Sequence, residues 1–258
     1  MAPEQSNPFI KQLASSDRRI RERALSALRT YLQQTPSLDL TSALKLLKGL
    51  YYCMWLSDKP RPQQQLARDL ADLLHVLKPD SFLVFARAFW QTMSREWNEI
   101  DRWRMDKYLY LVRLYVQEGF VYLRQKKWEE GLVEGYVGIM EEVGLNVRDG
   151  KVPNGLRYHV VDIYVDELDK ADEKDDAPLE VLLAPLRRLG KESPVKSLRE
   201  RVQEGLDNPR LEDWAGRREH GAESEEDDDQ EDGADVQSAG TLAHVGADSD
   251  DDFGGFED

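Results

Sequence analysis

His159 and Asp162 are the two residues whose types and spacing come nearest to a catalytic pair. They stand three positions apart, so on a helix they share one side, where a carboxylate can orient an imidazole as a general base. No convincing nucleophile and no glycine-rich pocket accompanies them. We therefore expect His159 to be a buried polar anchor between helices, and an enzyme is the weakest interpretation of the sequence.

Motifs of other enzyme classes are absent from the sequence. It contains no phosphate-binding G-x-x-x-x-G-K-S/T loop, no G-x-S-x-G nucleophile elbow and no H-E-x-x-H zinc helix. Cys53 is the only cysteine, so an internal disulfide and a cysteine-cluster zinc site are both excluded. We predict no catalytic residue, no metal, no cofactor and no small-molecule substrate.

Two segments carry aromatic and charged residues at a density that is unusual for a plain core. They are YYCMWLSDKPRP, which begins at Tyr51, and FWQTMSREWNEIDRWRMDKYLYLVRLYV, which begins at Phe89. Aromatic rings among arginines are typical of protein hot spots, RNA stacking and cation–π contacts. The alternative is that the tryptophans pack between helices and the charges link neighbouring helices. The predicted docking surface contains Trp55, Asp58, Lys59, Trp97, Arg102, Trp103, Arg104 and Lys107.

The sequence RRIRER, which begins at Arg18, is a second and weaker candidate surface. Its guanidinium groups could bind phosphates as planar forks, although a basic helix face is often only a solvated one. The candidate phosphate contacts are Arg18, Arg19, Arg21 and Arg23.

The elements that must position these residues are helices, because apolar residues recur with helical periodicity along most of the chain. We predict helix starts near positions 17, 41, 62, 80, 101, 128, 154, 178 and 194, with Asp17 and Asp80 as N-caps. The spacing of roughly twenty residues, or about forty per pair, is typical of HEAT-type repeats. Short loops make successive helices antiparallel. The sequence therefore predicts an all-α, HEAT-like antiparallel solenoid over residues 1–214, with Leu211 and Trp214 folded onto it.

One helical continuation matters for the docking surface. If helix ran on from the segment that holds Phe89 into the one that begins near Asp101, Trp97, Asp101 and Arg104 would share one side.

The formal net charge of -15 lies mostly in residues 215–258, which hold 16 acidic and 2 basic side chains. The preceding residues are nearly neutral, so the acidic balance does not exclude local basic patches. ESEEDDDQED and DSDDD have too few apolar residues to offset the entropy of ordering, so we predict a disordered acidic tail. It would serve solubility, or it would bind basic partners or be phosphorylated at Ser224 and Ser249, which precede acidic residues.

The sequence shows neither a signal peptide nor a membrane-spanning stretch. The first residues, MAPEQSNPFIKQ, lack the apolar core of a signal peptide, and the longest apolar stretch, 50–56, is too short to span a bilayer. We expect a soluble intracellular protein with no membrane partner.

Four stretches of the sequence resemble the eukaryotic ribosomal RNA-processing protein one family, whose domain is also called the nucleolar Nop-type domain. The motifs W-x-SDKP and REWN-x-IDRWR-x-DK are the long and specific parts of this resemblance, which reaches to about residue 206. The stretches are FIKQLASSDRRIRERAL, KLLKGLYYCMWLSDKP, FWQTMSREWNEIDRWRMDKYLYLVR and PNGLRYHVVDIYVDEL.

The resemblance implies a helical-repeat factor of the nucleus and nucleolus that matures the large-subunit RNA precursor. It implies partners on the early large-subunit precursor particle (pre-60S), including a WD-propeller factor and a Brix-domain factor, and no enzymatic activity or cofactor. Many animal relatives carry a long basic extension, whereas this chain has a short acidic tail, closer to fungal-type members. RNA contact through such an extension is therefore not carried over.

Two other functions stay open. The chain could be a generic helical-repeat adaptor for other proteins, or it could bind the ribosomal RNA precursor directly, which salt-sensitive binding would reveal.

Overall fold

The computed structural model describes residues 8–211 and Trp214, and these residues contain eleven α-helices and no strand. The predicted acidic tail over 215–258, with Ser224 and Ser249, lies outside the described residues. The all-α helical repeat is confirmed. The helices are α1 (Pro8–Leu13), α2 (Arg18–Gln34), α3 (Leu40–Trp55), α4 (Pro60–Ala71), α5 (Pro79–Glu96), α6 (Met105–Gln125), α7 (Glu130–Ile139), α8 (Asn154–Ala171), α9 (Leu179–Leu182), α10 (Ala184–Glu192) and α11 (Lys196–Leu206).

Three shorter helical segments complete this part of the chain. They are the 3-10 helices η1 (Asp72–Val76) and η2 (Trp97–Glu99) and the π-helical turn η3 (Met140–Gly144).

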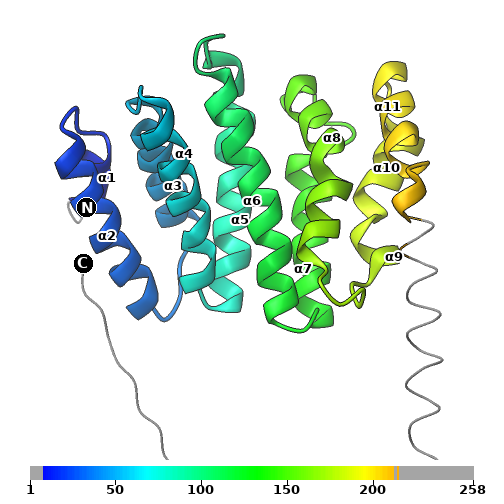
Figure 1. Cartoon of the computed structure of the whole chain (residues 1–258), viewed down its shortest axis with the longest axis horizontal. Helices are drawn as coiled ribbons and strands as arrows, with labels where there is room; N and C mark the ends of the chain where they lie inside the picture. Colours follow the sequence, from blue (N-terminus) through cyan, green and yellow to red (C-terminus); the bar gives the residue numbers. More distant parts are fainter. Residues whose placement is uncertain (1–7, 212–213, 215–258) are drawn as a thin grey trace, which may run out of the picture. The chain divides into compact units, whose positions relative to one another are not determined.

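The helices form two layers, because each packs against the helix two places along the chain. In one layer α1 contacts α3, α3 contacts α5, α5 contacts α7, and α7 contacts α9 and α10. In the other, which we call the even layer, α4 contacts α6, α6 contacts α8, and α8 contacts α11, while α2 meets η1. Figure 1 shows the helices side by side in chain order. This is the arrangement of stacked helix pairs, in which each pair buries its apolar stripes against its neighbours.

Three tyrosines of α6, which we call the tyrosine row, join it to the preceding helix pair. Tyr108, Tyr115 and Tyr122 stand seven residues apart and are buried, so they share one face of the helix. Their hydroxyls donate to backbone carbonyl oxygens of Tyr51, Leu70 and Leu77, at 2.9, 3.1 and 2.8 Å.

Aromatic stacking reinforces the tyrosine row. The ring of Tyr115 stacks on Phe89 with centroids 3.7 Å apart, and the ring of Tyr122 stacks on Phe82 at 4.0 Å. Phe82 and Phe89 both belong to α5, so α6 packs against helices of both layers.

Several helix boundaries differ from the predictions. Asp17 caps α2 as expected, through a 2.8 Å hydrogen bond from the backbone N–H of Arg19. Asp80, however, lies in the first turn of α5, whose N-cap is Lys78, because Pro79 can occupy the first helical position. The helix predicted from residue 178 is interrupted at Leu183, and α10 begins one residue before Pro185.

Helix does not continue from Trp97 to Arg104, so the condition under which Trp97, Asp101 and Arg104 would share one side is not met. α5 ends at Glu96, and Ile100 is extended, with φ -75° and ψ 116°. The Asp101 carboxylate then accepts hydrogen bonds from the backbone N–H groups of Trp103 and Arg104, both at 3.0 Å. An aspartate that binds its own backbone in this way competes with helix and favours a turn.

The far end of the described chain is folded onto the helices, as predicted. Trp214 is fully buried, and its indole N–H donates to the Asp172 carboxylate at 2.9 Å. The same carboxylate accepts hydrogen bonds from the backbone N–H groups of Asp176 and Ala177 at 3.0 and 3.1 Å. Trp214 thus packs against the turn that follows α8.

We predict that the folded chain loses stability as the pH rises above 10. Burial raises the pKa of both Tyr51 and Tyr122 to about 12, so the unfolded chain releases these protons first. The stability contributed by the neutral hydroxyls is complete below pH 10 and is lost as the pH passes about 12. Urea unfolding followed by circular dichroism at about pH 8 and about pH 11 measures this loss.

Tyr122→Phe is the matched variant. It should cost about 1 kcal/mol near pH 8, because one hydrogen bond is lost. Since it cannot ionise, its stability should decline less between the two pH values than that of the unchanged chain. An equal decline in both proteins would contradict the assignment.

Candidate interaction surface

The two aromatic and charged segments predicted from the sequence meet at one place, where the end of α3 lies against the start of α6. The Lys107 ammonium donates hydrogen bonds to the backbone carbonyls of Trp55 and Ser57, at 2.9 and 2.8 Å. These carbonyls lie where α3 ends, and terminal carbonyls have no partner within their own helix. Lys107 therefore caps α3 from α6.

Lys107 is buried, with 6% of its surface exposed. Burial lowers the pKa of its ammonium group to about 8, while the carboxylates of Asp58 and Asp101 oppose the shift. The side chain is thus an internal link between the helices and presents no surface to a partner.

Arg104 forms a second link between the same segments. Its guanidinium lies 4.5 Å from the centroid of the Trp55 ring and forms an ion pair with Asp101. Desolvation alone would raise the pKa of Asp101, but the hydrogen bonds and charge of Arg104 outweigh it and lower that pKa. Arg104 and Trp55 are both half-buried, so the turn at 100–104 is fixed onto the end of α3.

Arg21 is a third link. It is buried and donates hydrogen bonds to the carbonyls of Ser15 and Ser16 at 2.8 and 3.0 Å, and to that of Leu56 at 3.3 Å. Its guanidinium is therefore occupied inside the protein and is not available to a phosphate. Of the other candidate phosphate contacts, Arg18 pairs with Glu22 at 2.5 Å, and all three of Arg18, Arg19 and Arg23 are exposed.

Trp97 is also internal. It is 5% exposed, and a Cβ added at Gly155 would lie 3.2 Å from its indole nitrogen. Trp97 thus packs against the first turn of α8, as expected for a tryptophan between helices.

Trp103 is the exception among the described tryptophans, because 79% of its surface is exposed. The Arg102 guanidinium lies 4.5 Å from its ring centroid. Asp58 and Lys59 are exposed on the adjacent α3–α4 turn, which Lys107 and Arg104 hold beside it. We call these four exposed residues, Asp58, Lys59, Arg102 and Trp103, the Trp103 surface.

The structure thus divides the eight predicted docking residues into two groups. Four form the Trp103 surface, Trp55, Arg104 and Lys107 link the helices beneath it, and Trp97 packs against α8. Lys107 caps a helix that ends some fifty positions earlier in the chain, and such a contact leaves no local sequence signal. The capping role of Lys107 could therefore not be predicted from the sequence. The Asp101 turn did carry a signal, since aspartate favours such turns.

His159 is a polar anchor between helices, as expected. Its Nε2 lies 2.8 Å from the backbone carbonyl oxygen of Leu109 on α6. Burial lowers the pKa of His159. Asp162 instead pairs with Arg201 of α11 at 2.6 Å, so the proposed imidazole–carboxylate pair is not assembled.

Two kinds of site are absent from the part of the chain that the structure describes. Within residues 8–211 and Trp214, no group of three His, Cys, Asp or Glu side chains is placed to hold a metal ion. In the same part of the chain, no helix has the length and apolar character needed to cross a membrane.

The stacked helix pairs define a helical-repeat protein, and the Trp103 surface is its candidate contact site. A family model described as "Nucleolar protein, Nop52" matches residues 4–245. The chain belongs to this family, and the resemblance predicted from its motifs is confirmed.

Several curated relatives are similar to this chain. It is 39% identical over 173 residues to ribosomal RNA processing protein 1 homolog B of Homo sapiens. This match covers 65% of this chain and 23% of the relative. It is 34% identical over 173 residues to homolog A of Homo sapiens, with coverages of 65% and 37%. The homolog of Caenorhabditis elegans is 33% identical over 167 residues, with coverages of 63% and 42%. The match therefore spans less than half the length of each of these relatives.

We predict that Lys107→Met destabilises the protein by about 1–3 kcal/mol, because the Trp55 carbonyl loses its donor and the Ser57 carbonyl keeps only the Gln63 amide. Part of the loss is offset, since methionine does not have to be desolvated as a charge. Urea unfolding near pH 7 measures the change. Lys59→Met is the matched control, because Lys59 is exposed, and it should change stability by less than about 0.5 kcal/mol. Equal effects of the two variants would refute the capping role.

Proposed function

We propose that this protein is a nucleolar assembly factor for the large ribosomal subunit, acting as a non-catalytic scaffold in the processing of large-subunit ribosomal RNA. Family membership supports a role in ribosomal RNA processing, since the relatives carry that function in their names. The nucleolar description of the family supports the nucleus and nucleolus as its location. Stacked helix pairs suit a scaffold because they present an extended surface without needing a pocket.

The observation that carries the scaffold proposal is the exposure of Trp103 on a rigid turn. Asp101 fixes the backbone of this turn, and Arg104 and Lys107 fix it to α3. An anchor that is already ordered loses little conformational entropy on binding. Burying the ring against a partner would contribute about 3–4 kcal/mol, from an area of roughly 150 Å². Tryptophan and arginine are also enriched at the centre of protein interfaces.

We further propose that the partners are proteins of the large-subunit precursor particle, including a WD-propeller factor and a Brix-domain factor. Only the sequence resemblance supports these two classes. A generic adaptor would bind other proteins through the same surface.

Direct binding of the ribosomal RNA precursor is the second candidate function. The exposed guanidinium groups of Arg19 and Arg23 favour it, since they could contact phosphates. The burial of Arg21 weakens it. Binding of purified protein to ribosomal RNA that falls steeply with salt would support this function over the scaffold.

The proposal predicts that Arg102→Glu with Trp103→Ala separates the protein from its particle. Affinity purification of the tagged variant should recover at least fivefold less large-subunit precursor RNA and assembly factors than the unchanged chain. The expected loss follows from removing the anchor and reversing the neighbouring charge. Circular dichroism should be unchanged, because both side chains are exposed.

Val181→Ala is the matched control, since Val181 is an exposed apolar residue of α9, 38% exposed. It should leave the recovery unchanged. Full recovery with the Arg102 and Trp103 double variant would exclude the Trp103 surface as the docking site. A tagged chain that does not concentrate in nucleoli would contradict the assembly role and favour the generic adaptor.

A further inference from the structure

The charge of the even layer changes along the chain. α2 and α4 together contain seven arginines, no lysine and two carboxylates, and Asp17 and Asp72 beside their ends add two more carboxylates. Further along the same layer, α8 and α11 together contain five Lys and Arg side chains and six Asp and Glu side chains. An excess of one sign of charge produces a local potential that attracts ions of the opposite sign. The first two even helices are therefore the basic end of this layer.

Four of the seven arginines lie on exposed stripes of the two helices. Arg19 and Arg23 stand one turn apart on α2, and Arg61 and Arg68 stand two turns apart on α4. All four are exposed. Among the described residues, no carboxylate forms an ion pair with any of them. We call Arg19, Arg23, Arg61 and Arg68 the arginine face.

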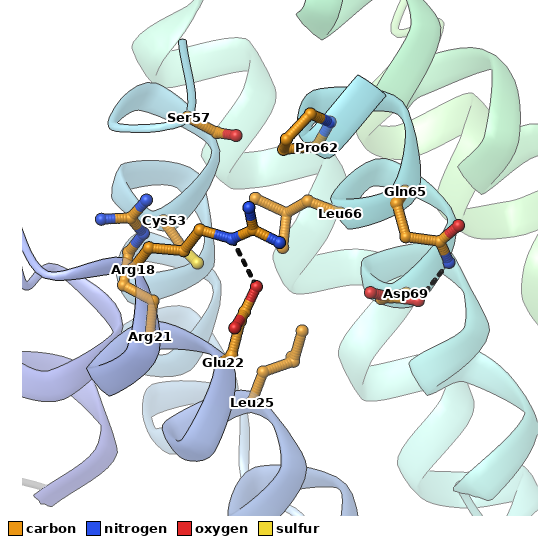
Figure 2. Close-up of a pocket in the computed structure, with 10 residues that line it drawn as sticks. All are labelled: Arg18, Arg21, Glu22, Leu25, Cys53, Ser57, Pro62, Gln65, Leu66 and Asp69. Carbon is orange, nitrogen blue, oxygen red and sulfur yellow. Dashed lines mark hydrogen bonds and ion pairs between the residues drawn. The ribbon is translucent and has the colours of Figure 1, made fainter. Parts of the chain in front are cut away.

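The carboxylates beside the arginine face are mostly engaged with other arginines. Glu22 pairs with Arg18 at 2.5 Å, and Asp72 pairs with Arg29 of α2 at 2.6 Å. Glu22 and Asp69 line the open crevice between α2, α3 and α4, and Figure 2 shows the Glu22 carboxylate directed at the Arg18 guanidinium. Of the carboxylates on α2 and α4 themselves, Asp69 alone is left to oppose the four charges of the arginine face.

The composition of the arginine face suits phosphates. A guanidinium group binds a phosphate as a planar fork with two parallel hydrogen bonds, and all four cations of this face are arginines. The four groups are exposed and unpaired, so they do not have to leave a carboxylate of the protein before they bind an anion. Repeated cations on two neighbouring helices favour a ligand with repeated negative charge, such as a nucleic-acid backbone.

The same face lacks the features that other anionic partners require. Within α2 and α4, which the structure describes completely, the only exposed large apolar side chain is Tyr31, and its ring lies 5.5 Å from that of Phe9 of α1. An acidic protein would therefore find no apolar anchor among the arginines, as protein interfaces have at their centre. Single-stranded RNA would find no ring on which to stack its bases. A double helix, which presents its backbone, needs neither.

We infer that the arginine face binds the phosphate backbone of an RNA double helix without reading its sequence. Arg19 and Arg23 contact one run of phosphates, and Arg61 and Arg68 contact another on the far side of the crevice. The inference rests on the second candidate function, direct binding of ribosomal RNA, and deepens it by naming the face and the class of RNA. It does not involve the Trp103 surface, so a scaffold that docks proteins there gains a separate contact with RNA.

Fluorescence anisotropy with the full chain tests the inference. The probe is a labelled RNA hairpin of arbitrary sequence, with a stem of about 16 base pairs, the length that double-stranded RNA-binding domains span. Four phosphate contacts should weaken binding on the order of a hundredfold between about 50 and about 200 mM salt. A stem of unrelated sequence should bind within about twofold of the first, and a uridine oligonucleotide should bind at least about fivefold more weakly.

Arg23→Glu with Arg68→Glu is the test variant. It should weaken binding of the hairpin at least about tenfold at low salt and make the salt dependence shallower, because two phosphate contacts become repulsive. Lys151→Glu with Lys191→Glu is the matched control, since it makes the same change in net charge at exposed positions outside α2 and α4. The control should change the affinity less than about twofold. All four side chains are exposed, so circular dichroism should show that both variants keep the fold.

Four results would overturn the inference. They are no binding of the hairpin at about 0.1 mM protein, which is the weak limit of non-specific nucleic-acid affinity, and an equal loss with the control variant. Tighter binding of the uridine oligonucleotide would assign the face to single-stranded RNA, and tighter binding of a polyglutamate peptide would assign it to an acidic protein. Both double variants leave the Trp103 surface unchanged, so failure of this inference and failure of the scaffold proposal are measured separately.

Discussion

Backbone carbonyls that require donors from another helix pair are the constraint on which this structure depends. Where a helix ends, or tightens into a 3-10 turn, its last carbonyls have no partner in their own helix. Leaving these carbonyls unpaired in the interior costs free energy. The chain meets this need from α6, where Lys107 and the tyrosine row donate to the α3–α4 pair. α8 makes further links of this kind between helices, since His159 Nε2 lies beside the Leu109 carbonyl within α6 and Tyr164 donates to Leu182 at 2.7 Å. These directional bonds fix the register between successive pairs, which apolar contact alone specifies only loosely.

That constraint also explains why residues that look functional in sequence are divided in space. Arg21, Arg104 and Lys107 are the kinds of side chain that bind phosphates or acidic partners, yet they hold the ends of neighbouring elements. The links of Arg104 and Lys107 hold the turn at 100–104 against α3, and Trp103 is exposed on this turn. The exposed ring of Trp103 therefore lies on a turn whose position the buried links fix.

The reach of the same hydrogen bonds also bears on the crevice between α2, α3 and α4. The tyrosine row ties α6 to the α3–α4 pair but does not reach α2, so the first step of the even layer is held mainly through η1 and Arg21. The crevice there is lined by apolar residues of the three helices, by two guanidinium groups and by the carboxylates of Glu22 and Asp69.

The sequence by itself determined the helical class, the approximate helix starts and the family, because apolar periodicity, capping residues and long motifs are local properties. It also determined that His159 would anchor helices and that Trp214 would fold back. Only the tertiary structure decided which charged and aromatic residues of one segment face solvent. Trp97 and Trp103 stand six positions apart in the same motif, yet one is buried against α8 and the other is 79% exposed. The reason is physical: the break at Ile100 and the Asp101 turn reset the direction of the chain, and burial depends on which distant helix then lies opposite.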